Sequence, residues 1–356
     1  MTDQGLPVVL LAGVSDKAVE RTALTVQWDM PRAVVVSYAV EGDALRRIVS
    51  HREGVIDDAR TIADAGCYGC AAREDLRPLL EQLASRGRWS SILVRLPAGA
   101  DPITVARVIG PSAICEADLD PAVRVVAVVA ALEGAPLVDD LLGDELLSDR
   151  GAAVMRGDER TVGEALVAIV EYADIAVLTE PAADEGASLL ARLMRPGSRV
   201  LSSCEALDGQ RLVRSARDPF EADEWVDPTR VVGPADFPSP GAWSRPFHPD
   251  RLLANLEKLG SGPRRSRGQF WLPSRPSQRI VWDGIGGQLS IGRVEGWGAQ
   301  SPMTRLFVCG IDSGQDELAR VFERTLVTDR EVADGIDAWV GRVDGLEPWL
   351  GPSADT

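Results

Sequence analysis

The stretch Leu6-Pro7-Val8-Val9-Leu10-Leu11-Ala12-Gly13-Val14-Ser15-Asp16 begins the first organised unit of this chain. Its apolar run ends at Gly13, and apolar residues then recur at helical spacing over residues 17–28. A continuous apolar run predicts a strand that is covered on both faces, as the strands of parallel sheets are. The stretch therefore predicts a strand, a short loop and a helix, which is the repeating unit of an α/β domain.

Strands and helices continue to alternate as far as residue 201. Further strands are predicted at residues 32–38, 91–96, 123–129, 174–178 and 199–201, and further helices at residues 76–83, 137–147 and 158–173. This alternation predicts an α/β fold with a doubly wound parallel sheet.

The composition changes beyond this sheet. Residues 227–246 contain five prolines and show little periodicity, which is typical of a linker. A helix, four strands and a second helix are predicted after it, which is an α+β arrangement. We therefore expect a first domain at residues 1–226, a linker at 227–242, a smaller second domain at 243–330 and an acidic, tryptophan-containing tail at 331–356.

The overall composition limits the classes of partner and the location. A formal net charge of −16 disfavours a direct grip on nucleic-acid phosphates, which proteins neutralise with Lys and Arg. No apolar run reaches the ~20 residues of a membrane span, and no signal sequence opens the chain. Five cysteines, an odd number, do not suggest a disulfide framework. We expect a cytoplasmic protein that binds proteins rather than nucleic acids or membranes.

Cys67 and Cys70 form a C-x-x-C pair just before a predicted helix. This spacing lets both sulfurs face one small ion, and the partial positive charge of a helix N-terminus favours the thiolate. The pair suits a soft metal such as Zn²⁺, or redox chemistry. It is only half of a zinc site, because further ligands must come from elsewhere in the chain or from a second protein. The alternative is two small apolar residues in a loop.

Arg73-Glu74-Asp75-Leu76 follow the pair, and the whole stretch resembles the C-x-C-C-(T/S)-x-R-x-(D/E)-L signature of the CobW family of metal-handling P-loop GTPases. The outer cysteines of the signature fall on Cys67 and Cys70, and the middle one falls on Gly69. Residues 158–178, 245–252 and 268–276 also resemble sequences of this family. The resemblance implies a P-loop GTPase-type sheet domain, then a smaller α+β CobW C-terminal domain, and a zinc ion as cofactor.

The phosphate-binding motif of that family is degenerate in this chain. In G-x-x-x-x-G-K-(S/T), the first glycine falls on Gly13, but the second glycine, the lysine and the hydroxyl fall on Ala18, Val19 and Glu20. Lys17 lies two positions early. Gly13 and Lys17 are therefore at most a weak remnant of a nucleotide site.

Two further nucleotide-handling elements are also altered. The guanine-reading N-K-x-D falls on Thr179-Glu180-Pro181-Ala182, and Arg95 and Leu96 occupy the region of the magnesium-linked acid and hydroxyl. We therefore expect a pseudo-GTPase with no catalytic residue, to which GTP and Mg²⁺ do not bind in the usual way.

Two isolated residues are weaker candidates for metal ligands. Glu41 follows the second predicted strand and is a possible third ligand, although a solvated loop acid is the ordinary alternative. His248 could complete a metal site, but its place before Pro249 favours a hydrogen bond at the start of a helix.

Two features of the second half could bind a partner protein. One is the most basic patch of this acidic chain, which either contacts an acidic partner or is a solvated strand edge. It consists of Arg264, Arg265, Arg267, Arg275 and Arg279. The other is the tail, where Trp339 and Trp349 either dock a partner or fold back on a domain.

Two functions follow from the resemblance. The first is a non-hydrolysing CobW-family protein of zinc homeostasis or zinc limitation, which acts by metal-dependent binding of a partner. Because similar actinobacterial proteins accompany zinc-starvation programmes that also idle ribosomes, the leading partners are ribosome-associated factors, with ribosome hibernation as the process. The alternative is an active GTP-dependent zinc metallochaperone.

Overall fold

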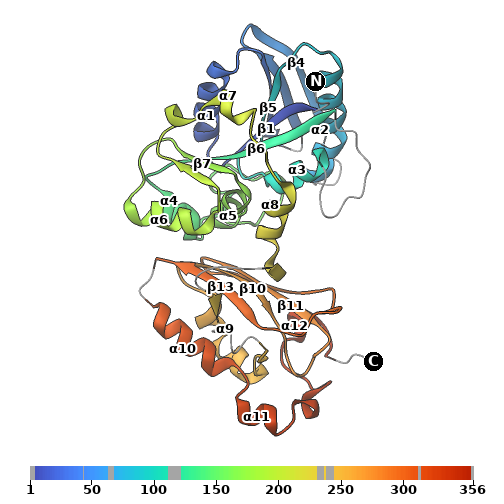
Figure 1. The fold of residues 1–356 in the computed structure, drawn as a ribbon, viewed down its shortest axis with the longest axis vertical. Coiled ribbons are helices and arrows are strands. Elements are labelled where there is room, and N and C mark those ends of the chain that lie inside the picture. Colours follow the sequence, from blue (N-terminus) through green and yellow to red (C-terminus); the bar gives the residue numbers. More distant parts are fainter. Residues whose placement is uncertain are drawn as a thin grey trace. The chain divides into compact units, whose positions relative to one another are not determined.

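The computed structural model describes residues 5–42, 44–62, 68–110, 122–230, 236–237, 244–311 and 314–353. The chain divides into two compact units, Met1–Leu141 with Glu145–Glu224 and Leu142–Asp144 with Trp225–Thr356. Each unit contains a sheet with helices packed on it (Figure 1).

The first unit contains an eight-stranded sheet in the order β4-β3-β2-β5-β1-β6-β7-β8. The strands from β2 to β8 in that order pair in parallel, whereas β3 and β4 extend the sheet as an antiparallel meander. The predicted doubly wound α/β class is confirmed. The strands are β1 (Leu6–Ala12), β2 (Ala33–Glu41), β3 (Ala44–His51), β4 (Gly54–Ile62), β5 (Ser91–Arg95), β6 (Val123–Leu132), β7 (Ile175–Leu178) and β8 (Arg199–Leu201).

Helices cover both faces of this sheet, which explains the continuous apolar strands (Figure 1). On one face, Val9 and Leu11 of β1 form a core with Val26 of α1. On the other face, α3 packs on β1 and β6, and α5 packs on α3. The helices are α1 (Asp16–Asp29), α2 (Tyr68–Ser85), α3 (Pro102–Ile109), α4 (Leu137–Leu142), α5 (Val162–Tyr172), α6 (Asp184–Leu193), α7 (Gly209–Leu212) and α8 (Pro219–Val226).

Strands β3 and β4 lie outside the predicted strands. Their sequences mix charged and apolar residues, and ion pairs join the charged ones across the two strands. Arg46 Nη2 lies 2.7 Å from Asp58 Oδ2, and Arg47 Nη2 lies 2.6 Å from Asp57 Oδ2. A search for buried apolar runs misses such strands, because only one of their faces is apolar.

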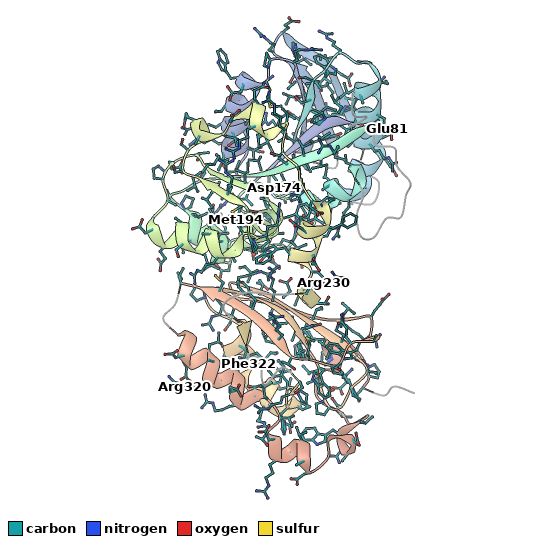
Figure 2. The ribbon with its side chains drawn as sticks, in the orientation of Figure 1. Glu81, Asp174, Met194, Arg230, Arg320 and Phe322 are labelled. Carbon is teal, nitrogen blue, oxygen red and sulfur yellow. The ribbon has the colours of Figure 1, made fainter. Side chains whose placement is uncertain are left out.

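The second unit contains an antiparallel five-stranded sheet in the order β12-β11-β10-β13-β9. Its strands are β9 (Asp236–Phe237), β10 (Arg264–Phe270), β11 (Arg279–Ile285), β12 (Gln288–Val294) and β13 (Arg305–Gly310). Helices α9 (Pro249–Gly260) and α10 (Gln315–Thr325) pack together and enclose a core that includes Phe247, Trp282 and Phe322, the last labelled in Figure 2. Among the described helices of both units, none is long and apolar enough to cross a membrane.

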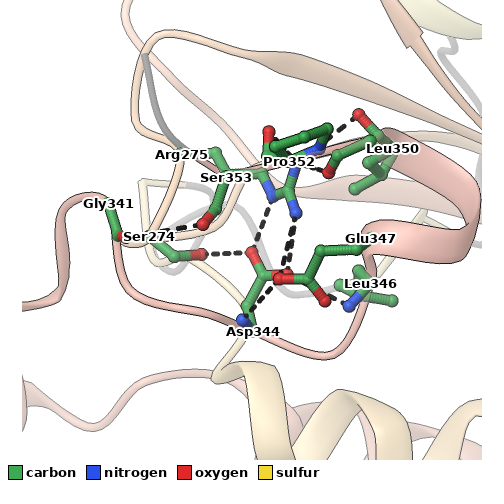
Figure 3. Close-up of polar contacts among 10 residues, drawn as sticks. Ser274, Arg275, Gly341, Asp344, Leu346, Glu347, Leu350, Pro352 and Ser353 are labelled. Atoms are coloured by element: carbon green, nitrogen blue, oxygen red, sulfur yellow. Dashed lines mark hydrogen bonds and ion pairs between the residues drawn. The ribbon is translucent and has the colours of Figure 1, made fainter. Parts of the chain in front are cut away.

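The tail is part of the second unit. It contains α11 (Asp329–Ala333), a 3₁₀ turn at Ile336–Trp339 and α12 (Glu347–Leu350). Asp344 accepts hydrogen bonds from Arg275 Nε at 2.7 Å and from Ser274 Oγ at 2.7 Å, and Arg275 Nη1 donates to the carbonyl of Gly351 at 2.8 Å (Figure 3). Although burial opposes it, the hydrogen bonds that Asp344 accepts from Arg275 and Ser274 lower the pKa of Asp344. The tail therefore folds back on its own domain, which was one of the two alternatives.

Candidate functional site

The loop between β1 and α1 is too short to be a P-loop. It has three residues, Gly13, Val14 and Ser15, because β1 ends at Ala12 and α1 begins at Asp16. Ser15 caps the helix by accepting a hydrogen bond from the Ala18 amide at 3.3 Å. A P-loop lies between strand and helix and wraps its amides around the phosphates, for which this loop leaves no length.

The residue at which α1 begins also affects how the P-loop motif aligns with this chain. Ala18 and Val19, which an ungapped alignment places at the glycine and the lysine, are 1% exposed and belong to the core side of α1. Lys17 lies in the first helical turn, so the lysine is not displaced along the helix; the loop before it is shortened. This alignment with a shortened loop is an alternative to the placement of the motif on Ala18, Val19 and Glu20, and the loss of the motif stays a prediction in both.

Gly13 has a packing role in this loop. A Cβ atom on it would lie 2.5 Å from the Ala131 carbonyl oxygen and 2.9 Å from Val19 Cγ2. Its own carbonyl accepts a hydrogen bond from the Gly99 amide at 2.9 Å. Close packing against β6 therefore explains this glycine without a nucleotide.

A carboxylate lies beside the start of α1. Glu133 follows β6, and its Oε1 accepts a hydrogen bond from Ser15 Oγ at 2.9 Å. Asp16 adds a second carboxylate in the first turn of the helix. Because the positive end of the helix dipole already faces these acids, a phosphate here would meet two negative charges.

These residues line a cavity of about 430 Å³. It lies where β1, β5 and β6 end, and its walls are Val14, Ser15, Asp16, Ala98, Glu133, Pro136, Arg150, Gly151 and Ala152. Ligands of open α/β sheets bind outside the carboxyl ends of the strands, where the strand order reverses, and β1 stands at that point in this sheet. The sequence reasoning did not identify Ser15, Glu133 or Arg150 as site residues. An acid directly after the long apolar run of β6 was the available signal.

The segment that follows β7 contacts the segment that follows β6. Glu180 Oε1 accepts a hydrogen bond from the Gly134 amide at 2.9 Å, and Glu180 Oε2 accepts one from Thr179 Oγ1 at 2.6 Å. The Thr179 hydrogen bond is the largest effect that lowers the pKa of Glu180, and Lys17 adds to it. A Cβ atom on Gly134 would lie 2.1 Å from the Glu180 carbonyl oxygen. The residues at the guanine-reading position therefore join two loops of the protein.

The C-x-x-C prediction falls outside the described part of the chain. This applies to Cys67 as a whole and to the side chain of Cys70, so both stay predicted metal ligands. The helix that follows is described: α2 begins at Tyr68, and Asp75 accepts hydrogen bonds from Tyr38 Oη at 2.6 Å and from Arg47. Asp75, two turns into the helix, thus ties α2 to β2 and β3. Over the described ranges, no three His, Cys, Asp or Glu side chains group in a way that could hold a metal ion.

Glu41, the weak candidate for a third ligand, is the last residue of β2 and already has two cationic neighbours. Its carboxylate lies 3.2 Å from Arg46 Nη1 and 2.7 Å from Arg60 Nη2. A metal ion would have to compete with both guanidinium groups for it.

His248 does not form the predicted hydrogen bond at the helix start. It occupies the N-cap position of α9, but its side chain caps no amide. The imidazole instead packs edge-on against Trp339, with 4.7 Å between the ring centres, and burial lowers the pKa of His248. The tail thus provides the partner of this ring.

The arginine cluster is not a solvated strand edge, because β10 is the central strand of its sheet. Arg265 and Arg267 are buried; the first pairs with Asp283, and the second donates to the Trp225 carbonyl at 2.5 Å. Arg264 and Arg279 are half-buried and Arg275 is fully buried. Contact of these side chains with a partner stays a prediction. Of the two tail tryptophans, Trp339 is half-buried and Trp349 is 45% exposed.

Comparisons with known proteins place this chain among similar sequences. Residues 242–326 match the cobalamin synthesis protein CobW C-terminal domain. The chain is 27% identical over 391 residues to the zinc chaperone Rv0106 of Mycobacterium tuberculosis, covering 96% of this chain and 93% of that protein. An uncharacterised protein of Mycobacterium bovis, Mb0109, shows the same identity and coverage. The crystal structure of the Zn(II)-bound YjiA GTPase from E. coli aligns with a TM-score of 0.35 and 15% identity, covering 90% of this chain and 99% of that chain.

Proposed function

This chain is a CobW-family protein, and from that premise we propose that it handles zinc without hydrolysing GTP and acts in the cytoplasm by binding a protein partner. The observation that carries the proposal is the three-residue β1–α1 loop, beside which Ser15 donates to the Glu133 carboxylate. A carboxylate there opposes the binding of phosphate. Glu180 supports the same conclusion, since it joins two loops at the guanine-reading position.

Zinc binding is proposed from the cysteine pair and from the relative. The similar mycobacterial protein is named a zinc chaperone. In this chain α2 begins at Tyr68, so the C-x-x-C pair spans the start of the helix. The positive end of an 18-residue helix favours thiolates, and thiolates are strong zinc ligands. Remaining ligands are expected from elsewhere in the chain or from the partner.

Calorimetric titration tests the two halves of this proposal separately. We expect no measurable binding of GTP with Mg²⁺ at protein concentrations of tens of micromolar, and binding of one zinc ion. Cys67→Ser with Cys70→Ser should abolish zinc binding without unfolding, because a large α/β core does not depend on one loop. Cys115→Ser, which changes a cysteine outside the pair, is the matched control and should bind zinc normally.

The alternative is an active GTP-dependent zinc metallochaperone, which would bind GTP with Mg²⁺. One observation favours it, because Lys17 lies in the first turn of α1. A micromolar dissociation constant for GTP, or slow hydrolysis that disappears in Lys17→Ala, would replace our proposal with this alternative. Unchanged zinc content in the double serine variant would place the metal elsewhere.

Binding of a partner should depend on zinc if the metal is the signal. We expect affinity capture from cells grown with and without a zinc chelator to return different protein sets for the wild type, with ribosome-associated factors as the leading candidates. The double serine variant should return the metal-free set under both conditions. Identical protein sets from the wild type and the double serine variant, each with and without the chelator, would eliminate metal-dependent partner binding.

A further inference from the structure

The cavity at the carboxyl ends of β1, β5 and β6 is suited to a ligand that differs from a nucleotide. We propose that it binds an organic cation, namely an ammonium or guanidinium group carried on an alkyl chain. The inference goes beyond zinc handling, because it concerns a different place in the first unit and a different chemical class of ligand.

The charge around the cavity is negative. Among the described residues that line it, Asp16 and Glu133 contribute two carboxylates and Arg150 contributes the single cation. Arg150 is already paired: its Nη1 lies 2.6 Å from Asp140 Oδ1, and its Nη2 contacts Glu145. The guanidinium is therefore compensated, and the carboxylates of Asp16 and Glu133 set the sign of the field in the cavity.

The hydrogen-bonding groups also favour a donor ligand. The hydroxyl of Ser15 donates to Glu133 and accepts from the Ala18 amide, so it is committed on both sides. At the start of α1 the Ala18 amide is thus already capped, and the carboxylates of Asp16 and Glu133 are among the groups that line the cavity. Carboxylates are acceptors only, and their strongest partners are cationic N–H groups.

The size and the apolar walls fit an alkyl chain that ends in a charge. A volume of about 430 Å³ lies within the range of small-molecule sites. Val14, Ala98, Pro136 and Ala152 supply apolar surface next to the acids, as a methylene chain requires. An organic cation suits the cavity better than a metal ion, because no group of three or more ligand side chains forms here or elsewhere among the described residues.

Two sources could supply this chemistry, a free polyamine or a basic side chain of a protein. Two ligands distinguish them in calorimetric titrations of the full chain: spermidine, and an acetylated lysine–arginine dipeptide amide. Inorganic phosphate serves as the anionic comparison. We expect one equivalent of at least one cationic ligand to bind, and no binding of phosphate.

Glu133→Gln is the decisive variant. The glutamine retains an acceptor oxygen for Ser15 but carries no charge, so the variant should fold and should bind the cation about tenfold more weakly. Glu81→Gln is the matched control; Glu81 is exposed on α2, pairs with Arg77 and is labelled in Figure 2. It removes the same charge from the chain outside the cavity and should leave affinity unchanged.

The outcomes are distinct. Tighter binding of spermidine assigns the site to free polyamines, and tighter binding of the dipeptide assigns it to a basic side chain of a protein. Absence of binding by both cations, binding of phosphate in their place, or equal loss of affinity in Glu133→Gln and Glu81→Gln would each overturn the proposal. Thermal unfolding of all three proteins verifies that the variants are folded.

Discussion

Asp344→Ala is expected to lower the free energy of unfolding of the second unit by about 3–5 kcal/mol, the usual cost of removing one partner of a buried ion pair. The Arg275 side chain is 0% exposed and the Asp344 side chain is 1% exposed. Without the carboxylate, the buried guanidinium would lose its closest anionic partner and all of its hydrogen bonds to Asp344 (Figure 3). It would keep only Glu347, whose Oε1 lies 3.8 Å from Arg275 Nη2, and the tail carbonyls of Leu350, Gly351 and Pro352.

Urea unfolding followed by tryptophan fluorescence measures this change. Seven of the nine tryptophans lie in residues 225–356, so the signal reports mainly on the second unit. Asp334→Ala removes an exposed acid from the same tail and is the matched control. A loss of less than about 1 kcal/mol in Asp344→Ala would mean that the tail detaches without cost. Replacing both partners together, as Arg275→Met with Asp344→Leu, should cost much less than Asp344→Ala alone.

Gly134→Ala is expected to destabilise the first unit by about 1–3 kcal/mol, the usual range for a methyl group forced into packed structure. Its Cβ would lie 2.1 Å from the Glu180 carbonyl oxygen and 2.7 Å from the Pro181 carbonyl oxygen. Both neighbours are backbone atoms, which cannot rotate away. To relieve the contact, the segments after β6 and β7 must separate and weaken the hydrogen bond from the Gly134 amide to Glu180.

Circular dichroism during urea unfolding is the appropriate measurement here, because few tryptophans lie in the first unit. Gly110→Ala is the control: its Cβ would approach only the Ala106 carbonyl oxygen, at an ordinary 3.6 Å. Equal stability of the two variants would show that the contact between the two segments is loose.

The candidate site could be predicted from the sequence only in outline. The degenerate P-loop and guanine-reading positions are visible in the order of residues, since both motifs depend on spacing along the chain. The hydrogen bond from Ser15 to Glu133 is not visible in the sequence, because the two residues are 118 positions apart. Only the parallel pairing of β1 with β6 brings them together. The same holds for Glu180 and the Gly134 amide, which the pairing of β6 with β7 places side by side.

The sequence by itself determined the α/β class of the first unit, because strands covered on both faces are apolar over nearly their whole length, as in β1 and β6. It also predicted the resemblance to the CobW C-terminal domain, which the family match over residues 242–326 confirms. Only the tertiary structure decided where α1 begins, that Arg265 and Arg267 of β10 are interior and that the tail docks through Asp344 on Arg275. The physical reason is that an arginine is stable inside a protein only where carboxylates and carbonyls converge on it. For Arg275 those groups come from residues about 70 positions away in the chain, beyond the reach of any local pattern.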